Sequence, residues 1–274
     1  GLRGFAEECH GDGLRTGLWL APFVCETRSA IYREHPDWLL RINGEPWYCG
    51  CNWSGFYALD IDNQEVQAYL KNVFHRVLED WGFDLVKLDF LYAAAPFGSE
   101  RESRAARMAR AMALLRQWCG DKLILGCGVP LMPCFGVVDY CRIGCDVSLD
   151  WDDKWFMRLI HRERVSTRQS IDNTIFRRQL NGRAFGNDPD VFLLRDENCT
   201  LTPAEKQKLA AANGCFSQIL LCSDPVERYS AENRERYAWV QQLFDRAEEI
   251  KTEADNGLSI GFRLDGKRYS IRIR

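Results

Sequence analysis

Residues 85–90 read Leu-Val-Lys-Leu-Asp-Phe, a short apolar run that is interrupted by a lysine and closed by an aspartate. Side chains alternate along a strand, so Lys87 and Asp89 face the same side. Strands of this kind are typical of parallel sheets, whose carboxyl edge carries the functional groups. The stretch therefore predicts an α/β fold and places Asp89 at its functional edge.

Six further apolar runs alternate with long amphipathic segments along the chain. They cover residues 17–23, 56–61, 123–127, 137–143, 190–194 and 216–222. This alternation is the pattern of repeated β-α units around a parallel sheet. Such barrels run to about 250 residues, so seven strands in this chain predict a (β/α)8 TIM barrel that lacks its first strand. A doubly wound sheet is the alternative.

Three helix starts carry the capping-box pattern, in which a cap residue stands three positions before a glutamate. The pairs are Asp62 with Glu65, Ser99 with Glu102, and Thr202 with Glu205. Pro203 suits the first position of the third helix. We expect the second helix to run through residue 118 and to stop at Gly120.

Near the end of the chain, the sequence pattern changes from helical to strand-like. A long helical stretch is predicted from about Ser230 to Glu253. Residues 257–262 and 267–273 then alternate apolar and polar side chains around Asp265-Gly266, a dipeptide favoured in tight hairpins. We therefore expect a barrel domain over residues 1–253 and the beginning of a C-terminal β-rich domain over residues 254–274.

Charge and hydropathy argue against several classes of partner. Lys and Arg total 36 against 39 Asp and Glu, and the two signs are interspersed. No apolar run reaches the roughly 18 residues that a membrane helix needs, and the N-terminus lacks the layout of a signal peptide. We expect a soluble, cytoplasmic protein that binds neither nucleic acid nor membrane.

The 12 cysteines are scattered through apolar segments. Close pairs occur at Cys49 and Cys51 and at Cys141 and Cys145, without the paired spacing of a zinc site. We interpret the cysteines as reduced and mostly buried packing residues. Metal binding is the alternative.

Carboxylates that close an apolar run are the candidates for chemistry in a barrel. They are Asp60, Asp62, Asp89, Asp146, Asp188 and Asp190. The ammonium of Lys87 would favour an ionised Asp89, which is the state a nucleophile needs. A structural ion pair between Lys87 and Asp89 is the alternative.

Arg142 and Asp146 stand four positions apart, across a glycine that permits an unusual turn. The apolar residues around Asp146 could supply the less polar setting that a proton-donating acid needs. Alternatively, Asp146 caps a following helix. Cleavage of a glycosidic bond requires two carboxylates from different strands, and we expect Asp89 and Asp146 to converge on one hollow.

Six motifs resemble, in this order, those of the α-galactosidases of glycoside hydrolase family 36, and related family 27 shares several of them. They are residues 17–23, 35–38 (His-Pro-Asp-Trp), 59–60 (Leu-Asp), 86–90 (Val-Lys-Leu-Asp-Phe), 142–147 (Arg-Ile-Gly-Cys-Asp-Val) and 187–190 (Asn-Asp-Pro-Asp). The joint occurrence of the last three is far more specific than any one of them.

The resemblance implies a (β/α)8 barrel and double displacement with retention, in which Asp89 attacks the anomeric carbon and Asp146 acts as acid and then as base. The residues expected to bind the sugar are Lys87, Arg142, Trp19, Asp60, Cys127 and Asp190. The expected substrates are α-galactosides such as melibiose or raffinose. No metal and no organic cofactor is implied, and a homo-oligomer of the full-length protein is compatible with the resemblance.

One family motif has no counterpart in this sequence. The family's first strand ends in an Asp-Asp-Gly-Trp motif that grips the galactose hydroxyls, and its absence agrees with a missing first strand. Two alternatives stay open, an α-N-acetylgalactosaminidase and an inactive carbohydrate-binding barrel. A dehydrogenase is disfavoured, because the Gly126-Cys127-Gly128 stretch does not continue as a dinucleotide fingerprint.

Overall fold

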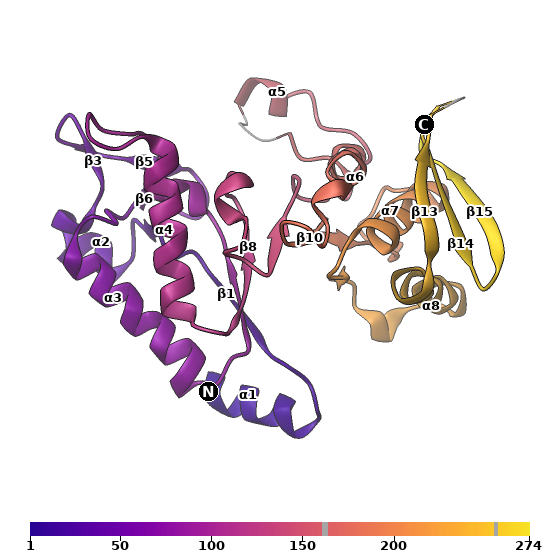
Figure 1. The fold of residues 1–274 in the computed structure, drawn as a ribbon, viewed down its shortest axis with the longest axis horizontal. Coiled ribbons are helices and arrows are strands. Elements are labelled where there is room, and N and C mark those ends of the chain that lie inside the picture. The colour runs from indigo at the N-terminus through magenta and orange to yellow at the C-terminus, as the bar shows by residue number, and fades with distance from the viewer. Residues whose placement is uncertain (161–163, 255–256) are drawn as a thin grey trace. The chain divides into compact units, whose positions relative to one another are not determined.

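The computed structural model describes residues 1–160, 164–254 and 257–274. They form two compact units, Gly1–Cys141 and Arg142–Arg274, each with its own strands and helices (Figure 1). None of the described helices combines the length and the apolar character of a membrane span.

The first unit is built on a parallel sheet. Its strands, in spatial order, are β1 (Gly17–Leu20), β7 (Leu85–Leu88), β8 (Leu123–Gly126) and β9 (Tyr140–Arg142), the last paired through Tyr140 and Cys141. Val86 and Leu88 are fully buried, and Lys87 lies between Trp19 and Leu125 in the register. The α/β class and the parallel strands expected from these four runs are confirmed.

Four helices belong to this unit, and the two longest supply most of the buried helical residues. They are α1 (Leu2–Gly11), α2 (Ala30–Glu34), α3 (Gln64–His75) and α4 (Arg104–Cys119), with 3-10 turns η1 (Pro36–Trp38), η3 (Leu91–Ala94) and η4 (Met132–Cys134) and a π-turn η2 (Arg76–Asp80). Helices α3 and α4 lie side by side (Figure 1). Gly120, with φ +54°, ends α4 as predicted.

Two of the predicted helix starts are displaced. Asn63, and not Asp62, caps α3 by accepting the N–H of Glu65 at 2.8 Å. Ser103, and not Ser99, caps α4. Both segments are rich in side chains able to cap, so the pattern alone matched a residue just before the true boundary.

The run at 56–61 does not join the parallel sheet, which corrects the prediction. Its strand β6 (Phe56–Ala58) pairs antiparallel with β2 (Val24–Glu26) and β5 (Tyr48–Gly50), beside the short ribbon of β3 (Arg41–Ile42) and β4 (Glu45–Pro46). Parallel pairing needs a long crossover, whereas a short loop joins β5 to β6. An apolar run alone does not reveal the direction of its partner.

The second unit contains short strands and three long helices. Its elements are α5 (Met157–Ile160), α6 (Thr167–Phe176), η5 (Arg178–Leu180), β10 (Gly186–Asp188), β11 (Val191–Phe192), α7 (Pro203–Phe216), β12 (Leu221–Cys222), η6 (Val226–Arg228), α8 (Ala231–Arg246), β13 (Glu248–Glu253), β14 (Ser259–Leu264) and β15 (Lys267–Arg272). Strand β11 pairs in parallel with β12. Strand β10 was not predicted, because Gly-Asn-Asp is no apolar run.

The capping box at Thr202 and Glu205 is present as predicted and begins α7. The predicted strand at 216–222 starts too early, because Phe216 is the last residue of α7 and the strand is confined to Leu221–Cys222. Burial accounts for this error, since most of the last two turns of α7 are buried and largely apolar, and a short apolar run does not distinguish a buried helix from a buried strand.

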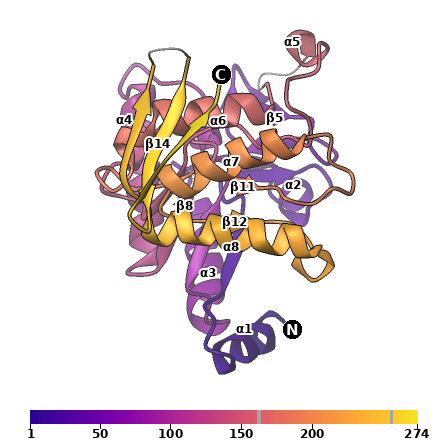
Figure 2. The ribbon, with the colours of Figure 1, turned by 90° about the vertical axis from the view of Figure 1, so that its right-hand side faces the viewer.

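The predicted helix to Glu253 is also too long. Helix α8 ends at Arg246, and β13 follows as the third strand of a sheet with the predicted β14–β15 hairpin. Asp265 and Gly266 turn this hairpin with positive φ angles of 47° and 78°. The sheet packs on α7 and α8 and shares their core (Figure 2). The domain boundary after residue 253 stays a prediction.

Several cysteines are buried thiols. Cys25, Cys119 and Cys215 form no disulfide, and burial raises the pKa to about 11 for Cys25 and about 12 for the other two. A thiol in such a setting stays protonated and unreactive. These three agree with the packing interpretation of the cysteines.

Candidate active site

Asp89 lies directly after β7, at the carboxyl end of the parallel sheet, and is partly exposed. The indole N–H of Trp19 donates to Oδ2 at 3.2 Å, and the N–H of Phe90 donates to Oδ1 at 2.7 Å. Its own N–H donates to the carbonyl of Leu20 at 2.9 Å. Both carboxylate oxygens are thus oriented by the protein, and lone pairs remain on each for a ligand.

Gly128 packs against this carboxylate. Its φ is +59°, and a Cβ built there would lie 3.2 Å from Asp89 Oδ1 and 3.1 Å from the nitrogen of Phe90. A side chain would therefore meet the carboxylate and the backbone beside it. Phe90 has a left-handed backbone with φ +54°, which is strained for a bulky residue and places that strain next to Asp89.

Lys87 and Trp19 occupy paired positions on β7 and β1. Within residues 1–160, 164–254 and 257–274, no ion pair joins Lys87 to Asp89, so the structural pair considered as the alternative is not formed. Cys127 is buried after β8, and its N–H donates to Leu88 O at 2.8 Å. These residues lie around the end of β7, and their contact with a sugar stays a prediction.

Asp60 is engaged by an arginine. It accepts a hydrogen bond from Arg107 Nη2 at 2.8 Å, and Arg107 also pairs with Asp62, which bonds to Arg110. Asp60 follows an antiparallel strand rather than a strand of the parallel sheet. Its predicted contact with substrate stays a prediction, and the geometry gives it a structural role in anchoring α4.

In the second unit, Arg142 binds three aspartates at once. Its Nη1 lies 2.9 Å from Asp146, its Nε 3.1 Å from Asp188 and its Nη2 2.8 Å from Asp190. The guanidinium and Asp188 are buried, whereas the side chain of Asp146 is 68% exposed. One positive charge therefore faces three carboxylates, and the outermost of them is the predicted acid/base.

Asp190 links this cluster to the backbone. Its second oxygen accepts the N–H of Val147 at 2.8 Å, and its carbonyl accepts Asn213 Nδ2 at 2.9 Å. Burial raises the pKa of the Asp190 carboxyl, although Arg142 and the N–H groups of Val147 and Val191 act in the opposite direction. The residue holds both Arg142 and the chain that follows Asp146.

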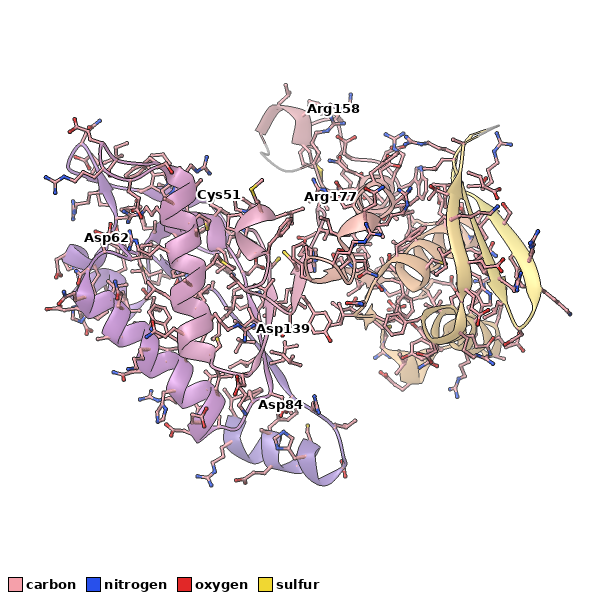
Figure 3. All side chains as sticks on the ribbon, in the orientation of Figure 1. Cys51, Asp62, Asp84, Asp139, Arg158 and Arg177 are labelled. Atoms are coloured by element: carbon pink, nitrogen blue, oxygen red, sulfur yellow. The ribbon has the colours of Figure 1, made fainter. Side chains whose placement is uncertain are left out.

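Arg177 secures the strand end from the other side. It donates to the carbonyl of Ile143, and its own carbonyl accepts Asn187 Nδ2 at 3.2 Å (Figure 3). Sequence reasoning counted Asp188 among the candidate carboxylates without giving it a role, and it did not single out Asn213. The Asn-Asp-Pro-Asp stretch could have indicated the ion pair of Asp188, since a buried aspartate needs a cationic partner.

Asp89 belongs to the first unit and Asp146 to the second. The structure describes each within its own unit, so their convergence on one sugar-sized hollow stays a prediction. In the described part of the chain, no group of three or more His, Cys, Asp or Glu side chains is arranged to hold a metal ion.

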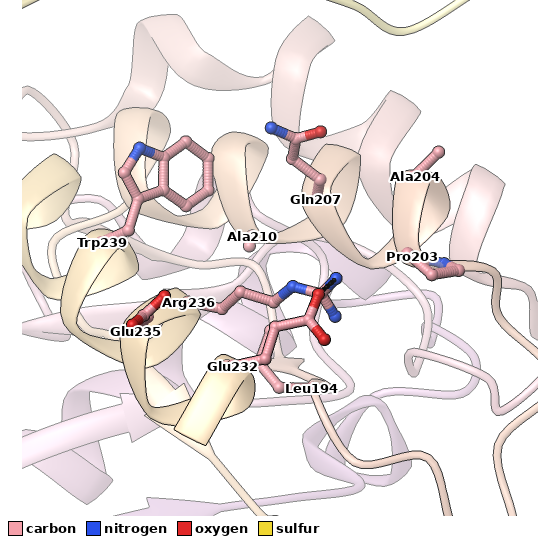
Figure 4. Close-up of a pocket in the computed structure, with 9 residues that line it drawn as sticks. All are labelled: Leu194, Pro203, Ala204, Gln207, Ala210, Glu232, Glu235, Arg236 and Trp239. Atoms are coloured by element: carbon pink, nitrogen blue, oxygen red, sulfur yellow. Dashed lines mark hydrogen bonds and ion pairs between the residues drawn. The ribbon is translucent and has the colours of Figure 1, made fainter. Parts of the chain in front are cut away.

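A groove elsewhere in the second unit carries none of the predicted residues. It measures about 550 Å³ and lies between α7 and α8, where Trp239, Gln207 and Arg236 line it (Figure 4). Helix faces of this kind lie away from the strand ends, so the groove is not the candidate active site.

Three comparisons show which known proteins the chain is similar to. The sequence model of the Melibiase family matches residues 1–116. The α-galactosidase Mel36A of Lactobacillus acidophilus is 32% identical over 89 residues, which are 32% of this chain and 12% of that protein. The solved α-galactosidase TtGalA of Thermus thermophilus, in complex with p-nitrophenyl α-D-galactopyranoside, is 31% identical over 98% of this chain, with a TM-score of 0.82. The chain is related to the α-galactosidases.

The chain spans 54% of the solved TtGalA chain, so it corresponds to about half of that enzyme. A second TtGalA structure, which is 33% identical over 88% of this chain with a TM-score of 0.78, contains stachyose. The resemblance to the α-galactosidases that six motifs indicated is confirmed. The α/β class with a parallel sheet is likewise confirmed, whereas a closed (β/α)8 barrel stays a prediction.

Proposed function

We propose that this chain is the catalytic part of a retaining exo-glycosidase that removes terminal α-galactosyl residues from oligosaccharides such as melibiose and raffinose. The observation that carries the proposal is Asp89, a partly exposed carboxylate oriented by Trp19 and Phe90 at the carboxyl end of a parallel strand. The relationship to the α-galactosidases supports the same choice.

In the proposed first step, Asp89 attacks the anomeric carbon and forms a glycosyl ester while the bond to the leaving oxygen breaks. Two N–H donors fix the orientation of the carboxylate, so little rotational freedom is lost when the sugar arrives. Gly128 leaves the carboxylate accessible on a side that any larger residue would fill.

Asp146 is proposed to give its proton to the leaving oxygen and then to take a proton from the water that hydrolyses the ester. Its exposure allows contact with substrate and water, while the buried Arg142 fixes its position. Because Asp188 and Asp190 also hold Arg142, the guanidinium stays in place through both proton transfers.

We propose that Lys87, Trp19, Arg142, Cys127, Asp60 and Asp190 line the galactose pocket, and that the parallel sheet forms part of a (β/α)8 barrel without its first strand. Asp190 would act on the substrate indirectly, because its two carboxylate oxygens bind Arg142 and the N–H of Val147. Lys87, which has no carboxylate partner in the described chain, is the better placed to bind hydroxyl groups.

The proposal is tested by assaying nitrophenyl α-galactoside against its N-acetylgalactosaminide counterpart. Preference for the first supports an α-galactosidase, and preference for the second supports an α-N-acetylgalactosaminidase. Calorimetry with galactose completes the test, because binding without hydrolysis of either substrate indicates an inactive carbohydrate-binding protein. Absence of both binding and hydrolysis contradicts the proposal.

A further inference from the structure

Four aromatic rings surround the strand end that carries Asp89. They are Trp19, Trp53, Phe56 and Phe90, which pack edge to face with centroids 5.1–6.1 Å apart. Phe56 is buried, whereas Trp19 is 44% and Trp53 59% exposed. The cluster therefore presents two indoles to solvent beside the proposed nucleophile.

The exposure of Trp53 forgoes the stabilisation that burial of its indole would give. Burial of a large aromatic side chain is worth about 2 kcal/mol or more, and an exposed one close to a carboxylate at a strand end is characteristic of a binding surface. Trp53 also adopts a left-handed backbone with φ +57°, a conformation that bulky residues rarely take. Packing alone explains neither feature.

The loop holds Trp53 in place. The hydroxyl of Thr27 donates to the Ser54 carbonyl at 2.9 Å, and its N–H donates to the Gly55 carbonyl at 3.1 Å. The N–H of Gly55 closes a turn on the Asn52 carbonyl at 3.0 Å. The backbone on both sides of Trp53 is thus held before any ligand binds, which reduces the entropic cost of binding.

From these contacts we infer that Trp53 forms a stacking platform for the sugar that leaves, the one joined to the anomeric carbon of the galactosyl group. The inference rests on the proposed function of Asp89. It assigns to the chain a second sugar-binding position, selective for a pyranose ring with an apolar C–H face.

The neighbours of Trp53 indicate which part of the substrate it would contact. The indole N–H of Trp19 donates to Asp89. The galactosyl ring, whose anomeric carbon must reach Asp89, would therefore lie beside Trp19. Trp53 stands one ring further along the cluster, in contact with Trp19 and Phe90. A glucosyl leaving group has C–H bonds on both faces, which suits stacking on an indole.

The kinetic test compares melibiose, which has a sugar leaving group, with α-galactosyl fluoride, which has none. Trp53→Ala should lower kcat/KM for melibiose about tenfold, mainly through KM, because stacking on an aromatic ring is worth roughly 1–3 kcal/mol. The fluoride should change less than about twofold, since it makes no contact there. Trp53→Tyr keeps an aromatic face and should retain most of the activity on melibiose.

Phe5→Ala is the matched control. Phe5 is 54% exposed on α1, which is tied through His10 to Asp84 at 2.8 Å (Figure 3). Asp84 precedes β7 and Asp89 follows it, so the two lie about 16 Å apart along the strand. Loss of an exposed aromatic ring at that end should leave both substrates unaffected.

Calorimetry in the Asp89→Asn background separates the two proposals, because binding is measured without turnover. We expect Trp53→Ala to weaken melibiose binding about tenfold and to leave galactose binding unchanged. An unchanged melibiose affinity, or an equal loss for galactose and melibiose, would overturn the platform while the proposed function stands. Absence of binding of either sugar to the Asp89→Asn protein would refute both.

Discussion

Asp89 and Asp146 are held by different groups. Two uncharged N–H donors orient Asp89, whereas a buried guanidinium holds Asp146. Donors that orient a carboxylate without neutralising it suit a nucleophile. Asp146 is 68% exposed and paired with Arg142, so within the second unit it lacks the less polar setting that the sequence suggested for a proton-donating acid.

Replacement of Asp89 by glycine should abolish turnover, with a loss of about three orders of magnitude or more, because no other group can form the glycosyl ester. Azide should restore part of the activity by occupying the vacated space and attacking the anomeric carbon. The measurement is hydrolysis of nitrophenyl α-galactoside with and without azide. Normal rates in Asp89→Gly would refute the assignment of the nucleophile.

Replacement of Asp146 by alanine should slow substrates with poor leaving groups more than activated ones. Only the former need protonation of the leaving oxygen, and general acid catalysis contributes about 10²- to 10⁴-fold. Rates on melibiose and on a nitrophenyl galactoside provide the comparison. An equal loss on both would argue against the acid role of Asp146.

Gly128→Ala should lower kcat/KM by about tenfold or more, because its Cβ would displace the Asp89 carboxylate and small displacements of reacting groups are costly. Gly136 is the matched control, since its φ is +70° and no atom lies within 4 Å of the built Cβ. Gly136→Ala should cost only about 1 kcal/mol of stability and leave activity intact. Similar activity losses in both variants would contradict a specific contact with Asp89.

At the scale of elements, helix α7 links the fold to the candidate site. Its first turn is closed by Thr202 and Glu205, and its buried residue Asn213 donates to the Asp190 carbonyl. The helix thereby supports the left-handed backbone of Asp190, whose φ is +77°. Local sequence signals begin the helix, and a tertiary contact gives it a role in the site.

Loss of the cap should weaken α7 without changing the chemistry directly. Thr202→Ala should lower the free energy of unfolding by about 1 kcal/mol, because one backbone N–H loses its acceptor. Thr202→Ser retains the oxygen and should lose about half of that or less. Urea denaturation of both variants is the measurement, and equal losses would show that the methyl group, and not the hydroxyl, matters.

At the scale of the whole molecule, the C-terminal hairpin shares the core of the second unit. Ile260, Phe262 and Leu264 are buried with Leu209 of α7 and Leu243 of α8. The hairpin therefore contributes to the stability of the helices before it, whatever the domain boundary is in the full-length protein.

Phe262→Ala should lower the free energy of unfolding by about 3–5 kcal/mol, because it leaves a cavity in this shared core. Tyr269 stacks on Phe262 with centroids 5.5 Å apart but is 44% exposed, so Tyr269→Ala should cost about 1 kcal/mol. Thermal unfolding followed by circular dichroism compares the two. A small effect of Phe262→Ala would indicate that residues 254–274 belong to a separate domain.

The sequence by itself determined the parallel strands β1, β7, β8 and β9, the position of Asp89 after β7, the capping box of α7 and the relationship to the α-galactosidases. These features depend on residues close together in the chain, through hydrophobic runs, capping residues and short motifs. The same local signals misplaced the boundaries of α3, α4 and α8, since several neighbouring residues fit each pattern equally well.

Only the tertiary structure decided the direction of β6, the contact of Gly128 with Asp89, the three partners of Arg142 and the exposure of Trp53. Each depends on residues far apart in the chain. Packing of the chain decides which surfaces come into contact. Those contacts set the direction of strand pairing, the burial of each side chain and the partners of each ion pair, and a local sequence pattern does not specify them.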